Sequence, residues 1–187
     1  MAIEEPKYTV IEKSGAFELR AYSPKIVAET LVSGSQDKAS RAGFRLIADY
    51  IFGNNTSRTG GSEAISMTAP VTMAPKSEKI SMTAPVSMEQ IGEQWRVHFV
   101  MPSQYTLDTL PKPNNPAVTL REVPKSTYAV IRFSGLASED KIATKTAELM
   151  AWLDGKGISP IGQPELARYN PPWTLPFLRR NEVMVAY

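Results

Sequence analysis

Two arginines and two phenylalanines recur at helical spacing between residues 36 and 52. With about 100° of rotation per residue, the face of this helix that points away from its apolar stripe holds Arg41, Phe44, Arg45, Ala48 and Phe52. Guanidinium groups pair well with carboxylates, and aromatic rings beside a small residue offer a flat apolar surface. These residues therefore predict a binding wall for a flat, apolar molecule that carries anionic groups.

The opposite face of the same helix predicts how the wall is held in place. It is an apolar stripe typical of a helix packed on a core, formed by Ala39, Ala42, Gly43, Leu46, Ile47 and Tyr50. A second interpretation of the outward face stays open. A loop or a second subunit could cover Phe44 and Phe52, because exposed apolar patches commonly mark interfaces.

Metal-binding side chains are scarce in this sequence. His98 is the single histidine, and on a strand it lies opposite Trp95, Val97 and Phe99, as an ordinary histidine on the less apolar face would. A lone histidine does not make a metal site. A thioether can ligate haem iron, but methionines at strand spacing are typical of core filling, and this applies to Met67, Met73, Met82 and Met88.

Catalytic patterns are also missing. The absence of cysteine excludes disulfides, thiolate metal sites and a cysteine nucleophile. One outward histidine supports no Ser-His-Asp arrangement, and no glycine-rich phosphate loop is present. The protein is therefore predicted not to be an enzyme.

Composition favours a globular binding domain. The 187 residues, with 42% hydrophobic and 21% charged content, suit a single domain with a real core. A net charge of +2 without a basic stripe gives no reason to expect nucleic acid. No apolar run reaches the roughly 18 residues of a membrane span. A cytoplasmic location is favoured, because residues 1–5 lack the layout of a signal peptide.

A nine-residue stretch is written twice near the middle of the chain. Ile65–Met73 and Ile80–Met88 differ only at the eighth position, and both alternate apolar and polar residues. Because a period of two indicates a strand with one buried face, we predict an antiparallel pair of strands joined by residues 74–79. Pro70 and Pro85 would each mark an edge, a bulge or the end of pairing.

The two halves of the chain resemble each other faintly. Leu19-Arg20 recurs as Leu120-Arg121, and the apolar face of the helix at 36–52 matches a second predicted helix, from about Ser138 to Leu153, at an offset of 103 residues. Both halves read as hairpin, strand, Ser-Gly and helix. A duplicated unit of this kind predicts an α+β fold, in which one barrel-like sheet is flanked by two helices.

Several motifs make the chain similar to the SOUL family of haem-binding proteins. They are Met-Thr-Ala-Pro-Val after a polar loop, Phe99-Val100-Met101-Pro102, the block from Tyr169 to Pro176, and Arg179-Arg180-Asn181-Glu182-Val183. This resemblance implies a distorted eight-stranded, mostly antiparallel barrel in a single domain of residues 1–187. Its pseudo-repeats would span about residues 8–93 and 94–187. It also implies non-covalent binding of haem or a related tetrapyrrole in an open apolar groove along the first helix, for sequestration or transport.

Carried over residue by residue, the resemblance places Arg41, with Arg45 one turn later, near the porphyrin propionates. Tyr169 and Trp173 would form the second wall of the groove, and Tyr169 is a candidate phenolate ligand. Asp49 stands where some members have a lysine, and Ala21 stands where one branch has a proposed histidine ligand, so axial ligation of that type is absent. We expect a monomer or a weak homo-oligomer. A binding module for another amphipathic molecule, or a protein-interaction domain using the same helix face, stays as an alternative.

Overall fold

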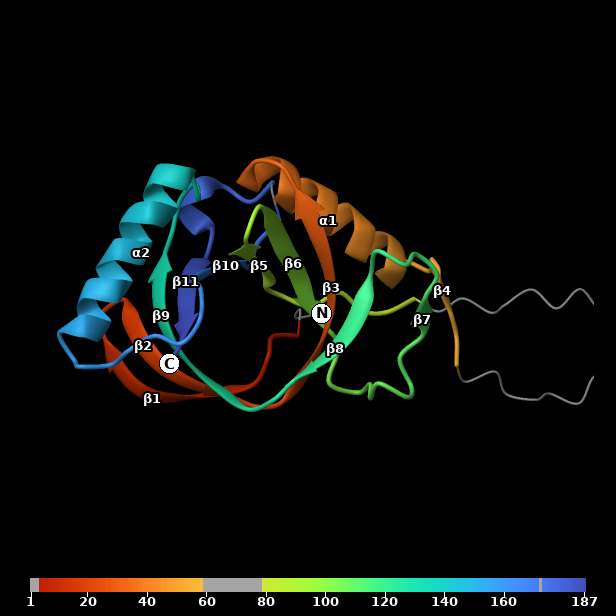
Figure 1. Ribbon diagram of the computed structural model, residues 1–187, viewed down its shortest axis with the longest axis horizontal. Coiled ribbons are helices and arrows are strands. Elements are labelled where there is room, and N and C mark those ends of the chain that lie inside the picture. The colour runs from red at the N-terminus through yellow and green to blue at the C-terminus, as the bar shows by residue number, and fades with distance from the viewer. Residues whose placement is uncertain (1–3, 59–78, 172) are drawn as a thin grey trace, which may run out of the picture.

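The computed structural model describes residues 4–58, 79–171 and 173–187. In this part of the chain, a curled antiparallel sheet forms a half-barrel, and two helices pack on its outside (Figure 1). The predicted α+β class is confirmed. The sheet consists of β1 (Tyr8–Ser14), β2 (Phe17–Tyr22), β3 (Lys25–Ser33), β5 (Val86–Ile91), β6 (Gln94–Val100), β8 (Thr119–Val123), β9 (Ser126–Phe133), β10 (Glu165–Arg168) and β11 (Asn181–Ala186).

The expected count of eight strands is wrong, because the described sheet has nine. Their order is β1-β2-β9-β11-β10-β5-β6-β3-β8. Within it, β2 and β8, β9 and β3, β11 and β6, and β10 and β5 occupy mirrored places, so β1 is the strand without a counterpart. It pairs with β2 alone, with a register shift between Val10 and Glu12. Among the described strands β1 and β8 are the two edges, so the sheet does not close into a full barrel.

The two long helices lie close to their predicted positions. The first, α1 (Gln36–Ile51), follows Ser35, and the second, α2 (Glu139–Asp154), follows Ser138, whose Oγ accepts a hydrogen bond from the Lys141 N–H as an N-cap does. Both helices have 16 residues. They begin 103 residues apart, from 36 to 139, the offset at which their apolar faces match. This spacing fits a duplicated unit, and the duplication itself stays a prediction.

The doubled nine-residue stretch behaves differently from its prediction. The first copy, Ile65–Met73, lies outside the described residues. In the second copy only the end is a strand, since β5 begins at Val86, directly after Pro85. This agrees with a proline at the end of ladder pairing. The hairpin partner of β5 is β6, with Met88 opposite Val97.

Alternation along the strands gives the sheet two unlike faces. The helix-covered face is apolar and includes Leu19, Met88, Val97, Phe99, Ile131 and Val183, which belong to the main buried cluster together with helix residues such as Ile47 and Leu153. The opposite face, here called the inner face, carries the residues that alternate with these. Many of them are polar or charged, although several are buried. They include Arg20, Tyr22, Ser87, His98, Tyr128, Glu165 and Glu182.

Two short elements complete the described chain. A two-stranded sheet pairs β4 (Asn55–Thr56) with β7 (Lys112–Pro113), and a 3-10 helix, η1, spans Pro176–Leu178. Among the described residues, neither long helix combines the length and the apolar character that crossing a membrane would need.

Candidate functional site

The position of α1 on the sheet depends on a glycine. A Cβ at Gly43 would lie 2.6 Å from the Cβ of Val97 on β6, closer than carbon atoms pack. The helix therefore approaches the strand as closely as a residue without a side chain allows. Ala39 and Ile47 are fully buried on the same side, which fixes the rotation of the helix. This rotation decides which side chains point outward.

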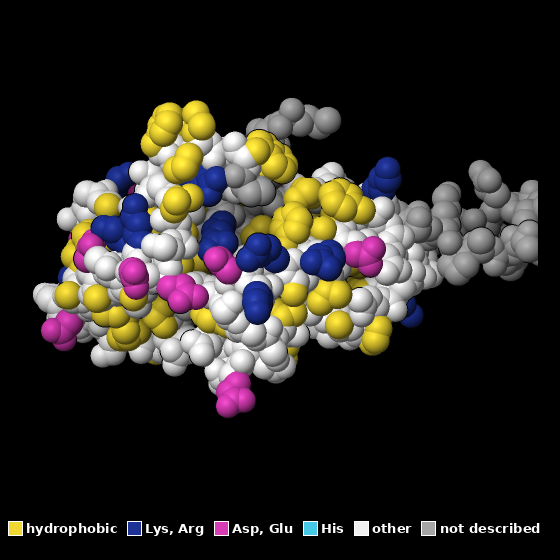
Figure 2. Space-filling view, turned by 90° about the horizontal axis from the view of Figure 1, so that it is seen from above, with side chains coloured by type: hydrophobic (Ala, Val, Ile, Leu, Met, Phe, Trp, Pro, Cys, Tyr) yellow, Lys and Arg dark blue, Asp and Glu magenta, His cyan; other side chains and the backbone are white. Residues whose placement is uncertain are grey.

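Arg41, Phe44, Arg45 and Phe52 lie on the outward side of α1, as predicted. Both arginines are exposed, Phe44 is 42% exposed and Phe52, the residue just after the helix, is 57% exposed. Basic and hydrophobic side chains gather side by side over the region of α1 in the view from above (Figure 2). The Phe44 ring also contacts the buried Phe99 ring, with the centroids 5.6 Å apart, so one edge of it is anchored in the core.

Ala48 and the arginines differ in how much surface they offer. Ala48 is only 7% exposed, so it contributes little more than a shallow floor between Phe44 and Phe52. The Arg41 Nε–H donates a 3.3 Å hydrogen bond to the Asp37 carbonyl within the helix. Arg45 makes no hydrogen bond or ion pair with any other described residue. Its guanidinium is therefore available to an anionic partner.

Arg168, at the end of β10, connects this helix to the other half of the molecule. Its Nη1 lies 3.4 Å from the Ser40 Oγ, its Nη2 lies 3.4 Å from the Ala137 carbonyl, and a carboxylate oxygen of Asp37 is 3.8 Å away. These contacts hold the start of α1 beside the segment that leads into α2. Sequence reasoning missed Arg168, because it sits on an ordinary strand outside any motif.

The two residues predicted to form a second wall have opposite environments. Trp173 is 83% exposed. Tyr169 is 9% exposed, its Oη donates a 2.7 Å hydrogen bond to Glu182, and the Arg180 guanidinium lies 3.7 Å from its ring centroid. Burial and the negative charge of Glu182 raise the pKa of Tyr169, which disfavours the phenolate that iron ligation would need.

The α1 face is an open surface in the described chain. Two cavities of about 590 and 500 Å³ are lined by described residues, and neither includes a residue of α1. The larger one lies where the N-terminal segment meets the beginning of β3 and the end of β8. The groove predicted along α1 is thus distinct from both of these cavities.

A buried ionic network occupies one end of the inner face. Arg20 is 1% exposed and Glu182 is fully buried, and their side chains form two hydrogen bonds of 2.8 and 3.0 Å. Glu182 also accepts from Arg180 across 2.9 Å. Burial alone would raise the pKa of Glu182, but the hydrogen bonds and charges of Arg20 and Arg180 hold it below its ordinary value.

A second group of titratable side chains lies further along the inner face. His98 Nε2 is 3.8 Å from a carboxylate oxygen of Glu165, and the Tyr128 hydroxyl donates to Glu165 across 3.2 Å. Burial, together with Lys25, Arg121 and Arg96, lowers the pKa of His98 to about 3. Burial and the facing carboxylate of Glu89 raise the pKa of Glu165 to about 7.

These inner-face residues were not predicted as a group. The alternation of Glu18, Arg20 and Tyr22 with apolar residues was visible, but it indicates a solvent-exposed face in an ordinary sheet. Only the curl of the sheet turns that face inward and buries it. His98 does lie on the face of β6 that points away from Val97 and Phe99, as predicted, but it is buried and not outward.

No group of three or more histidine, aspartate or glutamate side chains suited to a metal ion occurs in the described part of the chain. Among the methionines, Met88 is 3% exposed and packs in the core as predicted, whereas Met82 is 37% exposed. Met67 and Met73 lie outside the described residues.

Comparison with solved structures defines the fold class. The C-terminal domain of EcmrR is 10% identical, with a TM-score of 0.63 over 96% of each chain. A hydrolase from Listeria innocua is 12% identical, with a TM-score of 0.59 over 94% of this chain and 93% of the other. At such identities the likeness shows a shared fold and nothing about activity.

The family follows from the sequence itself. The family model described as SOUL heme-binding protein matches residues 3–186, so the chain belongs to the SOUL family, as its motifs indicated. The description of this family is that of haem-binding proteins. No curated protein matches the sequence.

Proposed function

We propose that the protein binds haem or a related tetrapyrrole, non-covalently, on the outward face of α1, and that it sequesters or transports this ligand. One observation carries the proposal: two exposed aromatic rings and two exposed guanidinium groups share one face of a helix that a close contact at Gly43 locks onto the sheet. Membership of the SOUL family supports it.

The residues present fit the chemistry of such a ligand. Phe44 and Phe52 offer apolar surface to a macrocycle, with Ala48 beneath them, and Arg41 and Arg45 offer charge-assisted hydrogen bonds to its carboxylates. Trp173 is exposed enough to contact a ligand. A bound haem would supply a redox-active iron, and this chain's contribution is burial and charge pairing.

Binding without an axial protein ligand follows from the surroundings of the candidate ligands. The Tyr169 phenol is committed to Glu182, and His98 is buried on the inner face, away from α1. The proposal therefore includes similar affinity for iron-containing and metal-free porphyrin. Reversible capture suits such a site better than redox catalysis does.

The deciding experiment is a titration with haemin followed at the Soret band. The double variant Arg41→Glu, Arg45→Glu is expected to bind at least about tenfold more weakly, because two attractive charge pairs become repulsive. Lys112→Glu, Lys125→Glu is the matched control, with the same change of net charge at exposed positions outside α1, and should bind like the wild type. If both variants lose haemin affinity equally, or if neither loses it, the binding site does not lie on α1.

Two further titrations separate the alternatives. Metal-free protoporphyrin should bind within a few-fold of haemin, and a large preference for the iron form would reveal an axial ligand. Bile pigments or unrelated amphiphiles that bind as tightly as haem would favour a general binding module. A mass that rises with concentration in solution, and falls on Phe52→Ser, would favour the protein-interaction function of the same face.

A further inference from the structure

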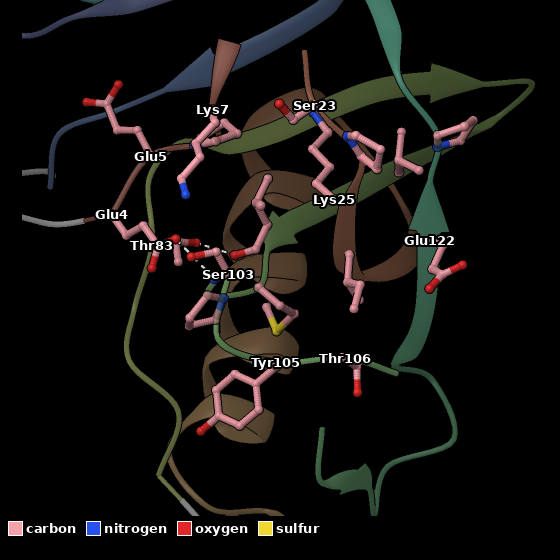
Figure 3. Close-up of a pocket in the computed structure, with 18 residues that line it drawn as sticks. Glu4, Glu5, Lys7, Ser23, Lys25, Thr83, Ser103, Tyr105, Thr106 and Glu122 are labelled. Atoms are coloured by element: carbon pink, nitrogen blue, oxygen red, sulfur yellow. Dashed lines mark hydrogen bonds between the residues drawn. The ribbon is translucent and has the colours of Figure 1, made fainter. Parts of the chain in front are cut away.

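Outside α1, the molecule has a second candidate site at one end of the half-barrel. A cavity of about 590 Å³ lies among the N-terminal segment, the start of β3, the segment after β6 and the end of β8. This volume is in the range of small-molecule pockets, roughly 300–1,000 Å³. In Figure 3 Glu4, Glu5 and Lys7 border it on one side, and Ser23, Lys25 and Glu122 border it on the other.

The walls of this cavity are mostly apolar. Aliphatic and proline side chains come from several separate segments, so the surface is built by the fold rather than by one loop. They are Pro6, Pro24, Ile26, Val100, Met101 and Val123. Met101 is 4% exposed and Val100 is 7% exposed, so the deeper part of the wall is continuous with the core.

Lys25 is the unusual polar residue of this lining. It is half-buried at the start of β3, and its ammonium lies 4.8 Å from the Tyr22 ring centroid and 5.8 Å from that of Tyr128. It forms no hydrogen bond or ion pair with another described residue. Aromatic faces stabilise a cation only partly, so this ammonium keeps its capacity for a charged acceptor.

The acidic residues around the cavity do not supply that acceptor. Glu5 is paired with Arg180, with an oxygen–nitrogen distance of 3.0 Å, and an oxygen of Glu4 accepts from the Ser103 N–H across 3.0 Å. Glu122 is exposed and, in Figure 3, points away from Lys25. Burial lowers the pKa of Lys25, and the charge of Glu165, which is not part of the cavity lining, opposes this without a direct ion pair.

We infer that this cavity binds a small amphipathic carboxylate, with its carboxylate on the Lys25 ammonium and its chain against Ile26, Val100 and Met101. An apolar wall beside a cation without a hydrogen-bond acceptor selects an anion that carries an apolar body. The site is independent of the proposed function, because it shares no residue with α1.

Calorimetric titration of the full chain with decanoate tests this inference. We expect saturable one-to-one binding, weakened about tenfold or more by Lys25→Met, which removes one charge-assisted hydrogen bond while keeping the length of the side chain. Lys7→Met removes the other lysine of the lining and should bind within about twofold of the wild type. Decanol and decyltrimethylammonium should bind more weakly than decanoate. No saturation, unchanged affinity in Lys25→Met, or preference for the cationic probe would overturn the inference.

Two further measurements distinguish binding in the cavity from an effect of the substitution on folding and from binding at α1. In the intact protein with ¹³C-methylated lysines, decanoate should shift the Lys25 signal, and an unshifted signal counts against the site whatever the variant does. Arg41→Glu, Arg45→Glu should bind decanoate normally, and Lys25→Met should bind haemin normally. Decanoate binding that is lost with the α1 arginines would place the ligand on α1 and reject the cavity.

Discussion

Tyr169 and Glu182 are joined by a hydrogen bond of 2.7 Å, in which the buried phenol donates to the buried carboxylate. Glu182 also accepts hydrogen bonds from both terminal nitrogens of Arg20. The stretch from Arg179 to Val183, one of the motifs shared with the SOUL family, therefore helps to hold the inner face of the half-barrel together. Of this network the resemblance had assigned only Tyr169 to a groove wall, and in the structure its phenol is bonded to Glu182.

Removing one partner of the Arg20–Glu182 pair should be strongly destabilising. Arg20→Met leaves the carboxylate of Glu182 buried with less compensation, and we expect a loss of about 3–5 kcal/mol in the free energy of unfolding. Urea denaturation measures it. The double variant Arg20→Met, Glu182→Leu should recover part of this loss, because the buried carboxylate is removed with its partner, while Arg180 keeps its ion pair with Glu5. A loss below about 1 kcal/mol in the single variant would show that water reaches the pair.

The sequence predicted the helix-covered side of the molecule well. The 3.6-residue period of α1 and the two-residue period of β6 each place apolar residues on one side, and Gly43 and Val97 meet there. Apolar patterning is local, so it can be read from the chain. The outward positions of Phe44 and Phe52 followed from the same periodicity.

The inner face could not be predicted in this way. Whether Arg20 or His98 faces water depends on how far the sheet curls, and curl results from the packing of all nine strands. The hydrogen bond of the Tyr169 phenol could not be predicted either. Its partner Glu182 lies on β11, and the register of β11 against β10, just before Tyr169, is fixed only by the sheet.

Phe44 and Phe52 should respond differently to truncation. Phe44→Ala removes a ring that packs on Phe99, so about 1 kcal/mol of stability should be lost. Phe52→Ala should change stability by less than about 0.5 kcal/mol, because its side chain is mostly exposed. Each should weaken haemin binding about 2- to 10-fold. Thermal unfolding and Soret titration of the same samples separate the two effects. If neither variant binds haemin more weakly than the wild type, both rings are excluded from the site.

Gly43→Ala should push α1 away from β6. The added Cβ would lie 2.6 Å from Val97 Cβ, and overpacking of this kind costs about 1–3 kcal/mol. Val97→Ala in the same chain should recover part of the loss by removing two of the three contacting carbons. A double-mutant cycle in urea measures the coupling energy. Additive effects would mean that the helix shifts freely, and the rigid placement of Arg41 and Arg45 would then be in doubt.

The pair of His98 and Glu165 should give the protein opposing pH dependences that nearly cancel. The pKa of Glu165 is raised from 4.5 to about 7, so its contribution to stability is present below pH 4.5 and is lost as the pH rises through 7. The pKa of His98 is lowered from 6.5 to about 3, so its contribution is present above pH 6.5 and is lost as the pH falls through 3. Between pH 4.5 and 6.5 the folded and unfolded states hold the same number of protons on this pair.

Single substitutions should separate the pH dependence of stability due to Glu165 from that due to His98. Relative to the wild type, Glu165→Gln should gain up to about 1.4 kcal/mol per pH unit as the pH rises between 4.5 and 7. His98→Gln should lose a similar amount per unit as the pH rises between 3 and 6.5. Both follow from urea denaturation at several pH values, with Lys125→Gln, an exposed position, as the control that should run parallel to the wild type. Stability curves of Glu165→Gln and His98→Gln that also run parallel to the wild type would mean that neither inner-face group is titrating differently in the folded state, so that water enters the half-barrel freely.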